Sequence, residues 1–282
     1  MLVSNFGEDY EILKVDNGMK LERWKNIKLL RPDPIVIWHK ETIKEIEADA
    51  VYHRSNTGGG YWENITKVPE RWTVNYKNLT FNIKQMGFKH TGLFPEQAVN
   101  WDRMIEAIKN ANKEVKVLNL FAYTGGASVA CLSAGASVVH VDSSKGINDW
   151  AKENVASSKL TDKPIRFLVD DVIKFVEREI RRGNKYDAII MDPPSYGRGA
   201  NKEVWSIEKD LDKLLSLCEQ ILSDDYLFVC VNTYSTNLSI VTLENILKVH
   251  FKGNIKVDEI VLPIKDSNLY LPCGVTGWIT HE

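Results

Sequence analysis

The chain has 282 residues, of which 44% are hydrophobic and 26% are charged, and its formal net charge is −2. A chain of this length and composition can bury a large core, in one large domain or two smaller ones. The near-neutral charge gives no strong electrostatic indication of nucleic-acid binding.

The cysteines and the N-terminus indicate where the protein resides. Cys131, Cys218, Cys230 and Cys273 are scattered and form no C-x-x-C pair, which argues against a disulfide framework and against a zinc site. The opening sequence MLVSNFGEDYEILK lacks the basic and apolar regions of a signal peptide. No apolar run approaches the roughly 18 residues of a membrane span. We therefore expect a cytoplasmic protein with reduced thiols, no metal and no membrane contact.

Residues 1–90 contain short alternating apolar and polar stretches separated by turn signals. DNG at 16–18 and YKN at 76–78 each predict a hairpin turn, and a short helix is expected over Glu41–Ala50. We expect a small β-rich (α+β) domain here. Its tryptophans are interpreted as core residues, with surface platforms as the alternative: Trp24, Trp38, Trp62 and Trp72.

From residue 91 the pattern changes to strand–helix alternation. Helices are expected in the intervening stretches, two of them near 203–222 and 237–250. The last two strand-like segments, IKVDEIVLP and GVTGWITH, are joined only by a loop and should form an antiparallel pair at one edge. We expect 91–282 to form a Rossmann-like, doubly wound, mostly parallel seven-stranded sheet. Its other strands are predicted from short apolar runs at 115–121, 137–142, 165–171, 186–192 and 226–232.

The residues that follow these strands are the candidate site, because ligands of open α/β sheets bind beyond the carboxyl ends of the strands. In NLFAYTGGASVA, Gly125 and Gly126 let the backbone approach a ligand at a helix N-terminus. This stretch matches neither the dinucleotide fingerprint nor the P-loop. Asp142, Asp171 and Asp192 stand at the ends of later strands. For Asp142 and Asp171 two interpretations are open: each binds a ligand, or each caps the next helix. Acids without a phosphate signature favour a nucleoside with a non-phosphate tail, such as S-adenosylmethionine.

Four segments, VLNLFAYTGGAS, VDSSKGINDWAKEN, DDVIKFV and MDPPSYGRG, resemble successive motifs of class I S-adenosylmethionine-dependent methyltransferases. More narrowly, the chain resembles the family of bacterial 23S rRNA cytosine-carbon-5 methyltransferases and their relatives. HTGLFPEQAVNWDRM, at 90–104, is similar to the segment that leads into the methyltransferase domain of that family. The resemblance covers about residues 90–235 and, more loosely, the front domain. It implies S-adenosylmethionine as the cofactor and ribosomal RNA as the substrate.

The resemblance also implies roles for single residues. Asp142, with Ser143 beside it, would hold the ribose hydroxyls, and Asp171 would meet the adenine amine. Asp192 would face the methionine amino group or the substrate, and Gln97 in FPEQ would close over the cofactor. The methionine and ribose portion would be lined by Asn119, Phe121, Tyr123, Thr124, Gly125 and Gly126.

The DPPSY corner is the candidate catalytic element. Pro193 and Pro194 fix φ and offer no backbone N–H, so the carbonyls of Asp192 and Pro193 can face a pocket. By resemblance to methyltransferases that modify exocyclic amines of bases, the acid and a proline carbonyl would position the amine, and Tyr196 would stack on the extruded base. The alternative is a rigid structural corner with Tyr196 packed in the core.

One departure from the family disfavours carbon-5 chemistry, which requires a reactive cysteine after the fifth strand. Thr233 and Tyr234 stand at that place, and Cys230 lies inside the predicted strand.

An RNA base is the substrate that the sequence favours. The alternatives are a small molecule or a protein side chain, with the front domain as a lid, and a non-catalytic binder that uses the cofactor fold to dock on a partner. A homodimer is compatible with the sequence but not indicated by it. Basic residues that either contact phosphates or form a solvated surface are Arg23, Lys25, Lys28, Arg31, Arg54, Arg71, Arg198 and Lys202.

Overall fold

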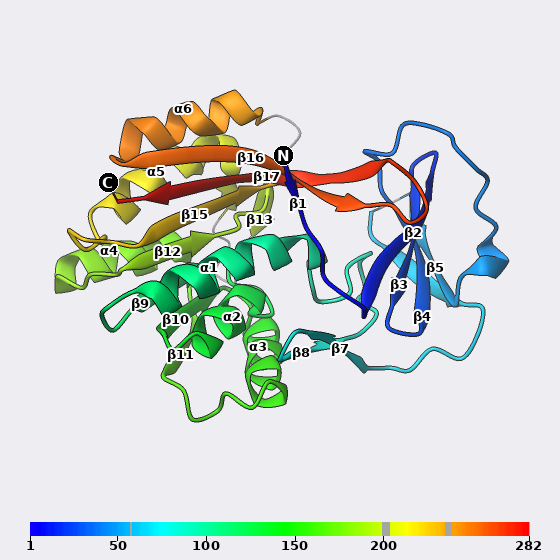
Figure 1. Ribbon diagram of the computed structural model, residues 1–282, viewed down its shortest axis with the longest axis horizontal. Coiled ribbons are helices and arrows are strands. Elements are labelled where there is room, and N and C mark those ends of the chain that lie inside the picture. The colour runs from blue at the N-terminus through cyan, green and yellow to red at the C-terminus, as the bar shows by residue number, and fades with distance from the viewer. Residues whose placement is uncertain (57, 199–203, 235–237, 282) are drawn as a thin grey trace. The chain divides into compact units, whose positions relative to one another are not determined.

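The structure is a computed structural model that describes residues 1–56, 58–198, 204–234 and 238–281 (Figure 1). The chain divides into two compact units. The large unit contains Met1, Asn100–Ile260 and Gly274–Glu282, and the small unit contains Leu2–Val99 and Val261–Cys273. The last strands of the chain therefore contribute residues to both units. The predicted division into domains 1–90 and 91–282 stays a prediction.

The principal sheet is doubly wound, as predicted. β9 pairs in parallel with β10 and β12, β10 with β11, and β12 with β15, whereas β17 runs antiparallel to β15. All seven predicted strands are present, and a two-residue strand at the N-terminus, β1, is added to them. The strand order is β1 (Leu2–Val3), β16 (Asn254–Pro263), β17 (Tyr270–Thr280), β15 (Phe228–Thr233), β12 (Ala188–Met191), β9 (Lys116–Leu120), β10 (Ser137–Asp142) and β11 (Ile165–Val169).

Helices lie on both faces of this sheet, and Figure 1 shows α1–α3 on one side and α4–α6 on the other. On α4, buried Val172, Phe175, Val176 and Glu179 follow the i, i+3, i+4, i+7 spacing of an amphipathic helix. No helix in the described ranges is long and apolar enough to cross a membrane. The helices are α1 (Ala98–Asn110), α2 (Gly126–Ser133), α3 (Lys145–Ser157), α4 (Val172–Arg182), α5 (Ile207–Glu219) and α6 (Ile240–His250).

Two helices begin later than the sequence pattern indicates. α5 begins at Ile207 because Val204–Ser206 forms a short strand, β14, paired with β13 (Tyr196–Arg198). α6 begins at Ile240, where the hydroxyl of Ser239 caps the helix by accepting the N–H of Thr242. The predicted start of α6, residue 237, lies outside the described residues.

The small unit is β-rich, as predicted, and both predicted hairpin turns are present. Asn17 and Gly18 have φ of 39° and 82°, the two positive values that a type I′ turn requires, and Lys77 has φ of 51°. The helix predicted over Glu41–Ala50 is wrong: a 3₁₀ turn, η1 (Glu45–Glu47), precedes β5 instead. The strands are β2 (Tyr10–Asp16), β3 (Met19–Trp24), β4 (Ile27–Pro32), β5 (Ala50–Arg54) and β6 (Gly60–Asn64) in one sheet, with a separate hairpin of β7 (Trp72–Tyr76) and β8 (Leu79–Ile83).

The tryptophans of the small unit differ in their burial. Trp24 is fully buried, which confirms its assignment to the core. Trp38, Trp62 and Trp72 are half-buried, so they belong neither to the deep core nor to an open platform.

A buried ion pair joins two neighbouring strands, β3 and β4, in the five-stranded sheet of the small unit. The guanidinium of Arg31 donates from Nε and, at 2.9 Å, from Nη2 to the carboxylate of Glu22, which is fully buried. The hydroxyl of Tyr10 donates to the same carboxylate at 2.6 Å, and Lys20 Nζ lies 3.9 Å away. Arg31 therefore serves the core and does not offer its charge to solvent. Among the basic residues of this unit that the sequence singled out, those exposed are Lys25, Lys28, Arg54 and Arg71.

We predict that Glu22→Gln destabilises the small unit in a pH-dependent way. Burial opposes ionisation of Glu22, but Arg31 and Lys20 outweigh burial and lower its pKa to about 2 from an ordinary value of 4.5. Because the folded pKa is the lower one, the ionised carboxylate stabilises the fold above about pH 4.5, and this contribution is lost as the pH falls toward 2. Removing the charge leaves the buried guanidinium of Arg31 without its counter-ion, whereas Lys20 keeps its ion pair with Asp33. The free energy of unfolding should therefore fall by about 3–5 kcal/mol at neutral pH.

Urea unfolding followed by tryptophan fluorescence at about pH 7, 4 and 3 measures this effect. The difference in free energy of unfolding between wild type and Glu22→Gln should be smaller at about pH 3 than at about pH 7. Glu70→Gln, which removes an exposed carboxylate of the same unit, should change little at any pH. A difference for Glu22→Gln that stays constant from neutral to acidic pH would contradict the assignment.

Candidate functional site

The segment between β9 and α2, residues 121–125, forms a strained loop at the end of a buried strand. Phe121, Tyr123 and Gly125 have φ of 52°, 52° and 84°. The left-handed region costs a residue with a Cβ roughly 1–2 kcal/mol. The loop is closed by the N–H of Gly125 donating to the carbonyl of Ala122 at 3.0 Å. Strain kept at the end of a strand is typical of ligand sites and supports a functional role for this loop.

The two glycines of this segment each have a geometric reason. A Cβ at Gly125 would add left-handed strain and lie 3.2 Å from the Cβ of Ala151. A Cβ at Gly126 would lie 2.7 Å from the indole of Trp101, which is buried. The glycines therefore let the loop and the start of α2 sit close against neighbouring helices and leave the backbone without side chains there.

Asp142, at the end of β10, connects the strained loop with the start of α3. Its Oδ2 accepts the N–H of Tyr123 at 3.0 Å and its Oδ1 accepts the N–H of Ser144 at 2.9 Å. Burial raises the pKa of Asp142, and these two hydrogen bonds oppose the rise. Each carboxylate oxygen has a second lone pair, so Asp142 can also accept a hydroxyl from a ligand. The N-cap of α3 is Ser144, so the alternative that Asp142 is only that cap is wrong; Ser143, between them, is exposed.

Asp171 has a defined structural role. Its carboxylate accepts the N–H of Lys174 at 2.9 Å and caps α4. The preceding Asp170 pairs with Arg178 of the same helix. The capping interpretation of Asp171 is confirmed, and its contact with an adenine amine stays a prediction.

Asn119 and Thr124 are buried behind the strained loop. The amide of Asn119 donates to the hydroxyl of Ser128 at 3.0 Å, and Ser128 hydrogen-bonds Nδ1 of His140 at 2.9 Å. Burial lowers the pKa of His140 to about 3, so the imidazole is neutral at physiological pH. The carbonyl of Thr124 accepts the amide of Asn154 at 2.8 Å. The hydrogen bond of Thr124 ties the loop to α3, and the hydrogen bonds of Asn119 and Ser128 tie β9 to α2 and β10. The predicted cofactor contacts of Asn119 and Thr124 stay predictions.

The DPPSY corner leads into a two-stranded hairpin, β13–β14, that the sequence pattern did not indicate. Asp192 is half-buried, Pro193 is buried and Pro194 is exposed. Tyr196 is 56% exposed, so the alternative that its ring packs in the core is wrong. Its hydroxyl accepts a hydrogen bond from Nε of Arg198 at 3.2 Å. Lys202, in the same connection, lies outside the described residues.

Trp205 joins the corner to the strained loop, and the sequence analysis missed it. Its indole N–H donates to the carbonyl of Pro194 at 2.7 Å, and its ring lies 4.9 Å from that of Phe121, centroid to centroid. The side chain is 9% exposed. The sequence pattern predicted a helix near 203–222, which includes Trp205. The alternation of apolar and polar residues in Val204–Ser206, after a turn that contains glycine, is also a hairpin signal.

The cysteines do not offer a nucleophile. Cys230 is fully buried in β15, and burial raises its pKa to about 11. Its sulfur lies 3.7 Å from the hydroxyl of Thr276 and 3.8 Å from the amide of Asn232. All four thiols are free, and burial raises the pKa of the other three as well. The absence of a cysteine at Thr233 and Tyr234 is therefore not compensated elsewhere in the chain.

The remaining predicted residue, Gln97, belongs to the small unit. It ends a short 3₁₀ helix, η2 (Pro95–Gln97), and is buried. Its closure over a cofactor stays a prediction. Within the described ranges, no group of three His, Cys, Asp or Glu side chains could hold a metal ion.

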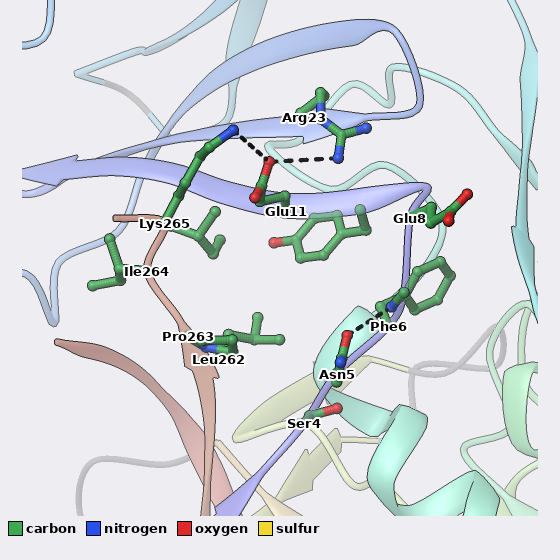
Figure 2. A pocket seen from close by; sticks show the side chains of 13 residues that line it. Ser4, Asn5, Phe6, Glu8, Glu11, Arg23, Leu262, Pro263, Ile264 and Lys265 are labelled. Carbon is green, nitrogen blue, oxygen red and sulfur yellow. Dashed lines mark hydrogen bonds and ion pairs between the residues drawn. The ribbon is translucent and has the colours of Figure 1, made fainter. Parts of the chain in front are cut away.

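The small unit also contains a pocket of about 430 Å³. Figure 2 shows Glu11 between Arg23 and Lys265 beside this pocket, with each cation 3.5 Å from the carboxylate. Phe6 and Leu262 contribute apolar walls. None of the predicted site residues lines it.

Comparisons with known proteins agree with the fold. A family model described as S-adenosylmethionine-dependent methyltransferase matches residues 51–251. The crystal structure of the SAM-dependent methyltransferase from Agrobacterium tumefaciens is 32% identical, with a TM-score of 0.94, and the match covers 100% of this chain and 94% of that one.

Two curated relatives are named as ribosomal RNA large subunit methyltransferases. Enzyme K/L from Pseudoalteromonas atlantica is 34% identical over 160 residues, which are 56% of this chain and 22% of that protein. Enzyme I from Enterobacter sp. is 45% identical over 85 residues, which are 30% of this chain and 22% of that protein. The chain thus spans about a fifth of the length of these relatives.

We predict that Asp142→Asn loosens the strained loop. An asparagine presents one oxygen and one NH₂ group where the carboxylate presents two oxygens, so either Tyr123 or Ser144 loses its acceptor. An unsatisfied donor costs about 1–3 kcal/mol, which predicts that amide hydrogen exchange at the affected residue is faster by about 5- to 150-fold. Asp149→Asn, on the exposed face of α3, is the matched control. Unchanged exchange at both amides would refute the role given to Asp142.

Proposed function

The chain belongs to the S-adenosylmethionine-dependent methyltransferase family, and on that premise we propose that it methylates a base of RNA, with ribosomal RNA as the substrate class. Its cofactor is S-adenosylmethionine. The observation that carries the proposal is the exposed ring of Tyr196, which lies two residues after the second proline of the corner that begins with the half-buried carboxylate of Asp192. The names of the curated relatives support the same substrate class.

The residues of the large unit fit the cofactor. Gly125 and Gly126 allow the strained loop and the first turn of α2 to pack closely against Ala151 and Trp101, and this places the N-terminus of α2 after β9, where ligands of open α/β sheets bind. The second lone pairs of Asp142 can accept the hydroxyls of a ribose. Asp171 would meet the adenine amine with the carboxylate oxygen that does not cap α4.

The proposed reaction depends on positioning. The bound cofactor supplies a methyl group already activated by its sulfonium. Asp192 would accept a hydrogen bond from the attacking amine of the base and orient its lone pair toward the methyl carbon. The N–C bond would form as the S–C bond breaks, S-adenosylhomocysteine would leave, and the amine proton would pass through the Asp192 carboxylate to water. Tyr196 holds the extruded base by stacking, which is worth about 1–3 kcal/mol and offsets much of the cost of unstacking. Trp205 holds the corner against the loop, so the two parts of the site keep their spacing.

We infer that the target is an exocyclic amine and not carbon-5 of cytosine. Carbon-5 methylation needs a thiolate that adds to the ring. The pKa of Cys230, raised by burial to about 11, leaves few thiolates at neutral pH, and the sulfur is fully buried. An amine carries its own lone pair and needs no covalent step. We place this activity in the cytoplasm, where the free thiols of the chain would remain reduced.

Nucleoside mass spectrometry of total RNA, from a strain without the gene and from its parent, tests the proposed function. Loss of one methylated nucleoside, restored by the plasmid-borne gene, is the expected result, and the identity of that nucleoside decides between amine and carbon. Identical nucleoside profiles, with cofactor binding by the purified protein intact, would instead favour a small molecule or a protein side chain as the substrate.

We predict that Tyr196→Ala lowers kcat/KM on RNA by about 5- to 100-fold, because the base loses its stacking surface. Tyr196→Phe keeps the ring and should retain most of the activity. The affinity for the cofactor, measured by titration calorimetry, should not change in either variant. Tyr270→Ala removes an exposed tyrosine of the small unit and serves as the control. Equal activity of Tyr196→Ala and wild type would remove the ring from the mechanism.

We predict that Cys230→Ala retains methyl transfer within about threefold of wild type, since a buried neutral thiol takes no chemical part. The measurement is transfer of radiolabelled methyl groups to RNA from the strain without the gene. A thermal unfolding curve of the variant separates a packing defect from a chemical one. Complete loss of transfer by a folded Cys230→Ala protein would restore the covalent carbon-5 mechanism.

A further inference from the structure

A loop of the small unit presents an aromatic ring to solvent on a fixed frame. We call residues 86–90, with the sequence MGFKH, the Phe88 loop. Its ends are joined by the N–H of Met86 donating to the carbonyl of His90 at 3.3 Å. Phe88, at its centre, is 62% exposed.

Two donors from the five-stranded sheet, buried Arg31 and half-buried Trp62, hold this loop by its backbone. Nη1 of Arg31 donates to the carbonyl of Lys89 at 2.7 Å, and the indole N–H of Trp62 donates to the carbonyl of Met86 at 2.9 Å. Arg31 is itself fixed by the Glu22 carboxylate. The loop is therefore ordered before any partner arrives, which reduces the entropy lost on binding.

The surroundings of the loop carry cationic side chains. Lys89 is half-buried, and its ammonium donates to the carbonyl of Pro32 at 3.3 Å. Burial lowers the pKa of Lys89, and the charges of Lys20, Arg31 and Arg54 lower it further, although Asp33 opposes them. Arg54 is exposed at the end of β5.

Two acids of this part of the small unit are already paired with other cations. Asp33 pairs with Lys20 at 3.1 Å, and Glu22 is taken by Arg31. Burial also lowers the pKa of His90 to about 4, so that ring adds no charge at neutral pH. Lys89, the residue that follows Phe88, and Arg54, whose charge acts on Lys89, remain as cations in this part of the small unit, and an anionic group would relieve their mutual repulsion.

We propose that the Phe88 loop binds an unpaired nucleotide of the RNA substrate, with the base stacked on Phe88 and the adjoining phosphate held by Lys89 and Arg54. The proposal rests on the proposed function and adds to it a binding site in the small unit. Every base has a π face, so stacking on an exposed aromatic ring suits single-stranded RNA. Phosphate supplies the negative charge that complements the two cations. A purely apolar partner would leave Lys89 and Arg54 uncompensated.

Fluorescence anisotropy with a labelled oligouridylate of about 12 nucleotides, within the length range of single-stranded binding sites, tests the site in the full-length protein. Phe88→Ala should weaken binding by about 5- to 100-fold, whereas Phe88→Trp, which keeps an aromatic ring at this position, should bind as tightly as wild type. Arg54→Gln should weaken binding and reduce the slope of log K against log salt by about 0.7, as expected for one phosphate contact on a single strand. Ile46→Ala is the matched control, because Ile46 is 76% exposed in the same unit but lies between Glu45 and Glu47.

The outcomes separate this proposal from the proposed function. If wild type neither binds the oligonucleotide nor methylates RNA, both fail. If wild type does both and Phe88→Ala binds equally well, the Phe88 loop is not an RNA site although the proposed function stands. If Phe88→Ala binds the oligonucleotide normally but loses activity only on intact ribosomal subunits, the loop contacts protein, and the proposal is overturned.

Discussion

The register of three central strands sets the position of the candidate groups in the large unit. Leu120 of β9 pairs with Val141 of β10 and with Met191 of β12. The strained loop, Asp142 and the DPPSY corner therefore begin at the same position along the three neighbouring strands. Because these strands are buried on both faces, their register is strongly specified. The residues that come next along the three strands are Phe121, Asp142 and Asp192.

The two units stabilise their loops by the same physical device. In each, a buried or half-buried charged side chain forms a hydrogen bond with the backbone of a loop. Asp142 accepts the N–H of Tyr123, and Arg31 donates to the carbonyl of Lys89. Backbone bonding fixes the path of a loop without requiring a particular side chain at the bonded position. It also explains why these charges are retained in spite of the cost of removing them from water.

The sequence predicted the sheet because its strands are apolar runs and its hairpins have residues suited to positive φ, such as Gly18. It could not predict β13–β14, because three-residue strands show no measurable period. It counted Arg31 among surface cations, since the partner Glu22 lies on a neighbouring strand and only the fold pairs them. Tyr196 could be placed at the corner from the motif, but its exposure depends on that hairpin. Trp205 was missed for the same reason.

The near-neutral charge of the chain limits how it could bind RNA. A net charge of −2 gives no long-range attraction to a polyanion. Affinity must then come from a few local contacts, and stacking is the contact that depends least on charge. The structure exposes aromatic rings at two places whose backbone accepts a hydrogen bond from a buried side chain. Tyr196 follows the corner that Trp205 supports, and Phe88 lies on the loop that Arg31 supports. Recognition by stacked bases with few phosphate contacts is therefore the mode of RNA binding that the composition and the structure both permit.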